Sequence, residues 1–232
     1  MITFGQLKKL SRLYVPTAKK QIADDDILEY LINQSVVDIV SDLKLLKKNA
    51  VFDVVAGQSD YDISSLVDDF ILMDKPGLKY YDGSQWVSKQ QFVAVTEEYL
   101  DIHYPLWRNS ASGTPQYYFK KDSVITVYPT PNATTLNGFS LFYCNKPTQM
   151  TNDNDYPFTG SNPAMEEYSV LWKAILLKTR SLMGTFVGDE QTESLADQKY
   201  MIELERRRKD LKRRPDIETS DELEMSSYGF NY

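Results

Sequence analysis

The sequence is poor in the two residue types that most often carry catalysis or bind metals. Its 232 residues include one cysteine and one histidine. Because Cys144 is alone, no internal disulfide and no cysteine-based metal site can form. His103 as the single histidine excludes most histidine-dependent catalysis and most zinc chemistry. It lies shortly before Pro105, at the expected end of a helix, so we interpret it as structural.

Long hydrophobic runs and an excess of positive charge are also missing. No stretch approaches the roughly 18 apolar residues of a membrane span, and residues 1–16 contain no run of signal-peptide length. We therefore expect a soluble protein that is made in the cytoplasm and does not contact membranes. With 26 basic and 33 acidic residues, the formal net charge is −7. Such a protein is not expected to coat nucleic acid as a whole.

The common catalytic motifs are missing as well. The sequence has no G-x-S-x-G, P-loop, G-x-G-x-x-G or H-E-x-x-H motif. Residues 151–155 resemble half of a calcium loop but lack its glycine and its closing glutamate. The run Asp24–Asp26 is more simply explained as a helix start, because carboxylates suit the positive end of a helix. We expect no enzymatic activity, no cofactor and no metal.

Both ends of the chain have the three- and four-residue apolar spacing of helices. A capping box at Thr3 and Gln6 predicts a helix over residues 4–13. A second helix is expected to open at Asp24–Asp26 and to end at Asn49. A third is expected to begin at Asn162-Pro163, and a last one spans residues 189–213 after a hinge bracketed by Gly184 and Gly188. The last helix is expected to make its main apolar contacts through Leu195, Ile202 and Leu211, with Met201 and Leu204 nearby.

The middle of the chain alternates as strands do. Residues 124–128 and 139–144 place β-branched and aromatic side chains at every second position. Together with residues 116–119 they predict a three-stranded antiparallel piece, whose second strand stops at Pro129. Asp82-Gly83 predicts a hairpin with a type I′ turn. Residues 61–63 predict a short return strand after residues 51–55, Pro76-Gly77 predicts a break, and Thr96 caps a short helix.

These patterns predict an α+β fold in three parts. Residues 1–49 and 160–214 form a helical bundle, since neither half could cover its own apolar stripe alone. Residues 50–150 form an inserted antiparallel β-rich segment, and residues 215–232 form an extended C-terminal tail.

Charge changes sign abruptly near the C-terminus. Residues 206–214 contain seven basic residues and one acidic residue, whereas the 17 residues after Pro215 hold five acidic residues and no lysine or arginine. The basic run fits a phosphate-binding site, a solvated helix end favoured by the helix dipole, or a charged interface with acidic neighbouring chains. The aromatic residues at the C-terminus, Tyr228, Phe230 and Tyr232, either belong to a disordered tail or dock into a partner. The candidate interface residues are Arg206, Arg207, Arg208, Lys212, Arg213, Arg214, Tyr228, Phe230 and Tyr232.

The layout resembles the head-to-tail adaptor (connector, or head-completion) proteins of tailed bacteriophages. The resemblance covers about residues 1–214. It rests on four stretches in addition to the N-terminal helices: Val54–Ile63, Pro115–Pro131, Phe142–Pro147 and the helices from Asn162 to Arg214.

This resemblance implies a structural virion protein at the head–tail junction. In such families, copies assemble as a ring, commonly of twelve, below the portal protein. The ring extends the DNA channel, helps to retain packaged DNA until ejection, and presents a surface to tail or nozzle proteins. DNA passes without sequence-specific binding. A C-terminal extension can dock on the portal, which would give Tyr228–Tyr232 that role.

Charge patterning agrees with such a ring, because the basic run 206–214 and the acidic tail supply complementary charge. Two other classes of function stay open. The chain could be a nucleic-acid-binding protein that uses residues 206–214, or an enzyme with a cleft that the sequence does not reveal.

Overall fold

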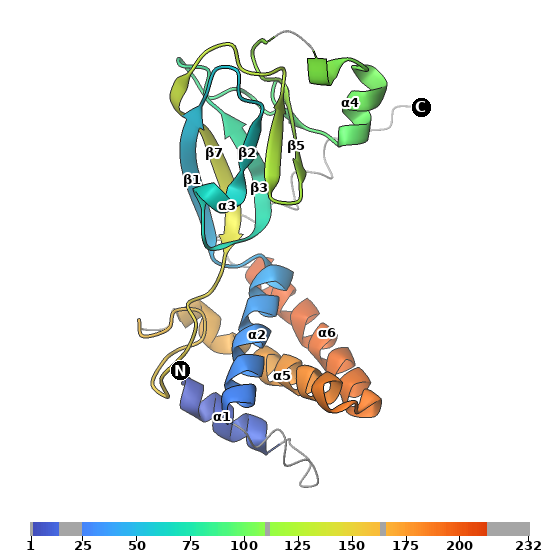
Figure 1. The fold of residues 1–232 in the computed structure, drawn as a ribbon. Helices are drawn as coiled ribbons and strands as arrows, with labels where there is room; N and C mark the ends of the chain where they lie inside the picture. Colours follow the sequence, from blue (N-terminus) through green and yellow to red (C-terminus); the bar gives the residue numbers. More distant parts are fainter. Residues whose placement is uncertain (1, 14–24, 110–111, 163–165, 213–232) are drawn as a thin grey trace. The chain divides into compact units, whose positions relative to one another are not determined.

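The structure is a computed structural model that describes residues 2–13, 25–109, 112–162 and 166–212 (Figure 1). The chain divides into two compact units. The described residues of Met1–Leu46 and Lys146–Tyr232 form a helical unit, and Lys47–Asn145 form a β unit. The predicted α+β class is confirmed. The predicted extended tail, residues 215–232, lies outside the described residues.

Two N-terminal helices open the helical unit. Helix α1 (Phe4–Arg12) begins at the predicted capping box, in which the side chains and backbones of Thr3 and Gln6 bond reciprocally. Helix α2 spans Asp25–Leu43. The predicted end of α2 at Asn49 was wrong, because Lys44 and Leu46 adopt positive φ angles of 51° and 54° and turn the chain into the first strand.

The C-terminal half of this unit starts later than predicted. A 3₁₀ helix, η3 (Glu166–Leu171), precedes helix α5 (Trp172–Val187). Asn162 is not the N-cap of α5, because α5 begins ten residues later at Trp172; Pro163 lies outside the described residues. Leu171 takes the N-cap position and makes no side-chain hydrogen bond there.

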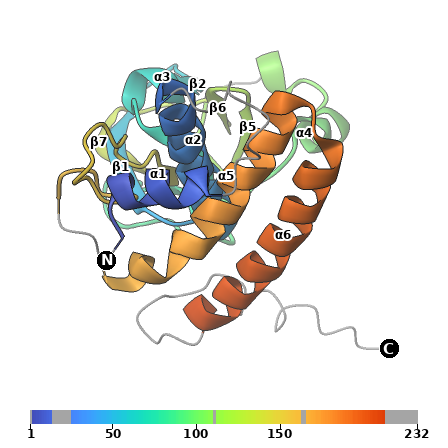
Figure 2. The same ribbon diagram turned by 90° about the horizontal axis from the view of Figure 1, so that it is seen from below.

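The predicted hinge at Gly184–Gly188 is a helix end. Helix α5 runs unbroken through Gly184 to Val187, and Gly188, with a φ of 68°, provides the left-handed C-cap. Helix α6 (Glu190–Lys212) follows directly and lies along α5 (Figure 2). A Cβ atom on Gly184 would lie 2.7 Å from the backbone nitrogen of Glu193. Gly184 therefore permits the close approach of α5 and α6.

The core of the helical unit lies between α2, α5 and α6. The hydroxyl oxygens of Ser35 on α2 and Thr179 on α5 lie 2.9 Å apart, and both residues are fully buried. Helix α6 buries Ala196, Tyr200 and Leu204. Leu204 is therefore buried as predicted, whereas two of the predicted main contacts lie on the wrong face: Leu195 is 46% and Ile202 71% exposed. Leu211 is half-buried.

The β unit contains two sheets. The first has the order β1-β7-β3, and the second has the order β2-β6-β5-β4. Their strands are β1 (Lys47–Val54), β2 (Asp60–Asp62), β3 (Phe70–Tyr80), β4 (Val93–Ala94), β5 (Tyr117–Lys121), β6 (Val124–Tyr128) and β7 (Thr135–Asn145). Two short helices, α3 (Ile63–Leu66) and α4 (Glu97–His103), and a 3₁₀ helix, η2 (Trp107–Asn109), complete the unit.

The predicted three-stranded piece is divided between the two sheets. The hairpin of β5 and β6 is confirmed, with Asp122 at a positive φ of 53° in its turn. Strand β7 instead pairs with β1 and β3. The reason is that Pro129 and Pro131 end β6, and the chain then continues into the other sheet.

Three local predictions in the β unit need correction. Strand β2 does not return along β1 but pairs with β6. Strand β3 continues through Pro76-Gly77, where its pairing with β7 shifts register between Met73 and Leu78. The hairpin at Tyr81 and Trp86 is present, but only Gly83 among its turn residues has a positive φ. A type I′ turn needs two such residues.

Aromatic rings from both sheets form the core of the β unit. Phe139 on β7 is fully buried, and its ring centre lies between 5.2 and 6.1 Å from four other rings: Phe52, Tyr61, Tyr80 and Phe92. Tyr61 comes from the second sheet, so Phe139 joins the two sheets.

Helix α4, which Thr96 caps as predicted, lies beside β5 (Figure 1). The Tyr104 and Tyr117 hydroxyls, 2.9 Å apart, fix its end.

Candidate interaction surfaces

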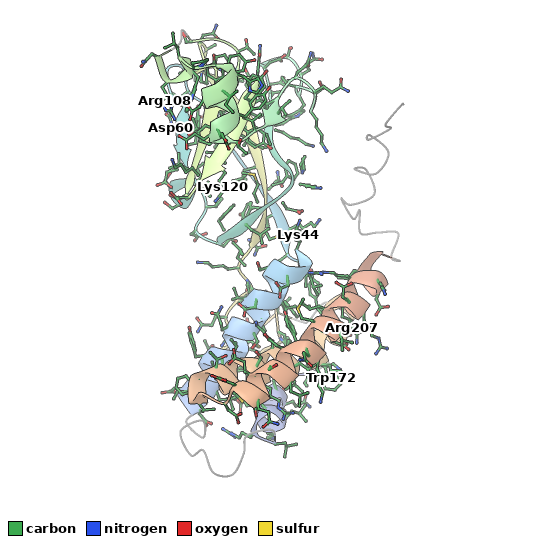
Figure 3. The ribbon with its side chains drawn as sticks, turned by 90° about the vertical axis from the view of Figure 1, so that its right-hand side faces the viewer. Lys44, Asp60, Arg108, Lys120, Trp172 and Arg207 are labelled. Atoms are coloured by element: carbon green, nitrogen blue, oxygen red, sulfur yellow. The ribbon has the colours of Figure 1, made fainter. Side chains whose placement is uncertain are left out.

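Two of the predicted interface arginines are held within the helical unit. The Arg207 guanidinium donates to the Glu203 carboxylate at 2.9 Å and to the Asp210 carboxylate at 3.2 Å (Figure 3). Glu203 is 4% exposed, so this pair compensates a buried charge. Arg208 donates to Glu205 at 2.8 Å and to the backbone carbonyl of Asp42 on α2 at 3.1 Å. Arg207 is thus paired along α6 itself, and Arg208 ties α6 to α2 while its side chain stays 41% exposed.

The other predicted residues divide into exposed and undescribed ones. Arg206 is exposed, as is its neighbour Lys209. Lys212 ends α6, and its side chain is not described. Arg213, Arg214, Tyr228, Phe230 and Tyr232 lie outside the described residues.

The exposed side of α6 carries a regular stripe. Its five residues follow at intervals of four, three, four and three, which places them on one face of a helix. All five are exposed, whereas Ala196, Tyr200 and Leu204 on another side of α6 are buried. We call these residues the outer stripe of α6: Leu195, Lys199, Ile202, Arg206 and Lys209.

The three cations of the outer stripe are free for an external partner. Within the part of the chain that the structure describes, Lys199, Arg206 and Lys209 form no salt bridge. Sequence reasoning identified Arg206 and the apolar residues separately. It missed that they alternate along one face, although the spacing was visible, because Leu195 and Ile202 were assigned to the core.

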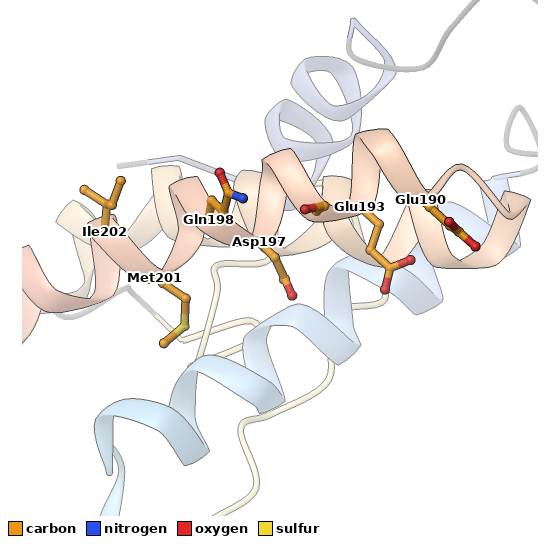
Figure 4. A pocket seen from close by; sticks show the side chains of 7 residues that line it. Glu190, Glu193, Asp197, Gln198, Met201 and Ile202 are labelled. Atoms are coloured by element: carbon orange, nitrogen blue, oxygen red, sulfur yellow. The ribbon is translucent and has the colours of Figure 1, made fainter.

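An acidic hollow of about 750 Å³ adjoins this stripe (Figure 4). Glu190, Glu193 and Asp197 line its N-terminal part, and Met201 and Ile202 follow on the same helix. Asp197 accepts a hydrogen bond from the Ser181 hydroxyl at 2.7 Å. Among residues 2–13, 25–109, 112–162 and 166–212, no group of histidine, cysteine and acidic side chains is arranged to hold a metal ion. The hollow is a surface feature that faces solvent.

A second hollow, of about 950 Å³, lies beside β4 in the β unit. Its lining includes Gln85, Gln91, Tyr99 and Tyr117. The hydrogen bond between the Tyr117 and Tyr104 hydroxyls raises the pKa of Tyr117 to about 12, so this phenol stays protonated near neutral pH. His103 stacks on Tyr99 at 4.1 Å and contacts the Tyr99 carbonyl through Nδ1 at 2.9 Å.

Helix α4 adds an exposed apolar surface that sequence reasoning did not single out. Ile102 is 65% and Leu106 75% exposed. Arg108 beside them donates to Asp101 at 2.6 Å and to Glu97 at 2.8 Å. Lys121 first, and then Arg108, lower the pKa of Glu97, so this exposed carboxylate stays charged. The region has the apolar centre and polar rim that protein interfaces show.

Comparisons with known proteins gave one family. A family model described as "SU10 adaptor protein" matches residues 2–224. The match spans both compact units and the whole of α6. No curated protein matches the sequence. None of the described helices is long and apolar enough to cross a membrane.

Proposed function

Because the chain belongs to the SU10 adaptor protein family, a family of bacteriophage adaptor proteins, we propose that it is the ring protein that joins the phage head to the tail. Copies of the chain form a dodecameric ring below the portal protein. The ring extends the DNA channel and presents the attachment surface for tail or nozzle proteins. The protein is a structural part of the virion neck, not an enzyme.

The family match over residues 2–224 is the observation that carries this proposal. It includes the β unit and both halves of the helical unit, so it does not rest on a shared fragment.

Exposed apolar residues on both units support ring assembly. A closed ring needs two different, complementary surfaces on every copy. The helical unit exposes Trp172, Phe186 and Ile202, and the β unit exposes Ile102 and Leu106. Each is more than 40% exposed, so each unit has apolar side chains that a neighbouring copy can contact.

The negative net charge supports the proposal that the ring lines a channel along which DNA slides. A formal net charge of −7 disfavours general adhesion to phosphates. The alternative, nucleic-acid binding through residues 206–214, loses two of its cations, because Arg207 and Arg208 are paired with Glu203 and Glu205.

The test is assembly with the portal protein encoded by the same genome. Mass by light scattering and negative-stain images would be recorded for the chain alone and mixed with portal rings. We expect stoichiometric capture of the chain as a second ring on the portal. A chain that stays free in the presence of portal rings contradicts the proposal.

A parallel measurement separates the nucleic-acid alternative. Binding to duplex DNA would be measured against salt for the wild type and for Arg206→Ala. A steep salt dependence that this substitution reduces would favour the alternative. We expect weak binding that the substitution does not change.

A further inference from the structure

The outer stripe of α6 is a face without a partner in the described helical unit. A helix that only covers a core exposes polar residues on its far side. Here the far side instead alternates aliphatic and basic residues, with Leu195 at 46% and Ile202 at 71% exposure. Covering such side chains with a partner removes apolar surface from water, which favours association. The face has the composition of a binding surface.

The pattern of the stripe defines the chemistry of its partner. Lys199 lies between the two aliphatic residues, and Arg206 and Lys209 follow them. A nucleic acid would pair with the cations but would leave Leu195 and Ile202 against a charged backbone. An acidic peptide with interspersed apolar residues satisfies both kinds of side chain.

The chain itself contains such a peptide. Residues 216–225 hold five carboxylates and no basic residue. Their sequence, DIETSDELEM, interleaves these acids with Ile217, Leu223 and Met225. We propose that the outer stripe of α6 binds the acidic C-terminal segment, residues 216–225, of a neighbouring copy.

Length agrees with this assignment. From Leu195 to Lys209 the stripe covers about 21 Å, at 1.5 Å per helical residue. An extended segment of ten residues spans about 33 to 36 Å. The acidic segment can therefore lie along the whole stripe.

The position of the segment favours the neighbour over the same copy. Three residues, Arg213, Arg214 and Pro215, separate α6 from the acidic segment. A fold back onto the same helix would have to reverse the chain within them. Proline fixes its own φ and disfavours the helical region for the residue before it, which favours an extended exit from α6. Binding to the stripe of a neighbouring copy needs no such reversal.

This inference rests on the proposed ring, since it names the contact between neighbouring copies. It gives every copy one donor segment and one receiving stripe. That is the heterologous arrangement that closes a ring.

Zero-length carbodiimide cross-linking of the full chain tests the contact. The reagent joins carboxylates to the amines of Lys199 and Lys209 when they touch. Equal amounts of ¹⁴N- and ¹⁵N-labelled chain would be mixed, with and without portal rings, and cross-linked peptides analysed by mass spectrometry. We expect mixed-isotope links between residues 216–224 and Lys199 or Lys209.

Charge reversal provides the matched variants. The stripe variant carries Lys199→Glu, Arg206→Glu and Lys209→Glu. The segment variant replaces all five acids of residues 216–224 by lysine. Each variant alone should lose subunit association by about tenfold or more at low salt, and mixing the two should restore it. The control, Lys9→Glu with Lys44→Glu and Lys89→Glu, reverses three other exposed cations and should associate like the wild type.

The outcomes separate the two proposals. Links within single copies only, or no links to the stripe, overturn this inference. If the stripe variant still forms rings on the portal as the wild type does, the stripe contact is wrong while the ring proposal stands. If the wild type itself is not captured by the portal, the ring proposal is contradicted, and the stripe contact that rests on it is contradicted as well.

Discussion

At the residue scale, Gly184 sets how closely α5 and α6 pack. The backbone nitrogen of Glu193 would lie 2.7 Å from a Cβ atom at this position, closer than atoms of that kind approach. The contact is with backbone, so it cannot be relieved by a side-chain rotation.

We expect Gly184→Ala to destabilise the helical unit by about 1–3 kcal/mol. The loss should appear even though alanine is more stable than glycine by about 1 kcal/mol at an exposed position inside a helix. Urea denaturation followed by circular dichroism measures the change. The control is Thr185→Ala at the next, exposed position, which should stay close to wild type. A more stable Gly184→Ala protein would show that the two helices can separate without cost.

Tyr200, a buried residue of α6, is linked to α2 through a partly buried hydrogen bond. Its hydroxyl donates to the Asp42 carboxylate at 2.7 Å. Burial, and then the Asp42 carboxylate, raise the pKa of the phenol well above its usual range. The folded state thus holds the phenol proton more tightly than the unfolded chain, whose tyrosine pKa is about 10.

We expect the Tyr200 contribution to be complete below pH ~10 and to disappear as the pH rises toward the folded-state pKa. Tyr200→Phe should therefore cost about 1–2 kcal/mol at pH 7. Its difference from wild type should shrink above pH ~10. Urea denaturation between neutral and alkaline pH measures this difference. Tyr30→Phe, at a residue 64% exposed, is the control. A difference that grows with pH would contradict the assignment.

At the scale of elements, the sequence predicted what neighbours along the chain determine. Thr3 and Thr96 cap their helices because a hydroxyl two or three residues away can reach the free N–H groups. The hairpin of β5 and β6 is equally local. Such features depend on a few adjacent residues, so the types of those residues were sufficient to predict them.

Elements that depend on distant partners could not be predicted. Strand β7 alternates as expected, yet nothing in residues 139–144 indicates that its partners are β1 and β3. The end of α2 was missed because Leu46 continued the apolar spacing, while the backbone had already turned at Lys44. In α6 the exposed Leu195 and Ile202 are more hydrophobic than the buried Ala196 and Tyr200, so the pattern indicated the wrong face.

Paired substitutions in α6 test its orientation. Leu204→Ala removes a side chain that is 1% exposed and should cost about 2–5 kcal/mol. Ile202→Ala, at a residue 71% exposed, should change the free energy of unfolding by less than about 0.5 kcal/mol. Both would be measured by urea denaturation. Equal losses of stability would mean that α6 is rotated so that Ile202 and Leu204 are buried to the same extent.

At the scale of the whole molecule, the β unit is inserted into the helical one. Lys47 is paired with Cys144 at the point where the chain enters and leaves the β unit. The two ends of the insertion are therefore neighbours, about 5 Å apart as in any antiparallel pair. The helical unit has its own core between α2, α5 and α6.

We expect the helical unit to fold when residues 47–145 are replaced by a short Gly/Ser linker, because closing a short gap costs little chain entropy. Circular dichroism should show a helical protein with a cooperative thermal transition. Loss of that transition would show that the helices need the β unit. Replacing residues 60–126 with the same linker is the control, because it removes β2, β3, β4, β5 and most of β6 and should disrupt the β unit.

Sequence reasoning about the interface could not anticipate which cations are paired within the folded unit. It identified the basic end of α6 from composition, but pairing within the folded unit decides which cations are free. Arg207 and Arg208 are held by Glu203 and Glu205, whereas Arg206 between them is exposed. Charge alone cannot show this difference, because all three residues are identical.

The paired ends of the insertion also bear on how such a protein evolves. A segment that begins and ends at one antiparallel pair can be exchanged between genes as a cassette, since its removal leaves the host chain with a gap that a turn can close. The loops far from Lys47 and Cys144 can then diversify while the helical unit is inherited unchanged. Lineages that recombine at these two positions would acquire a new β unit in a single genetic event.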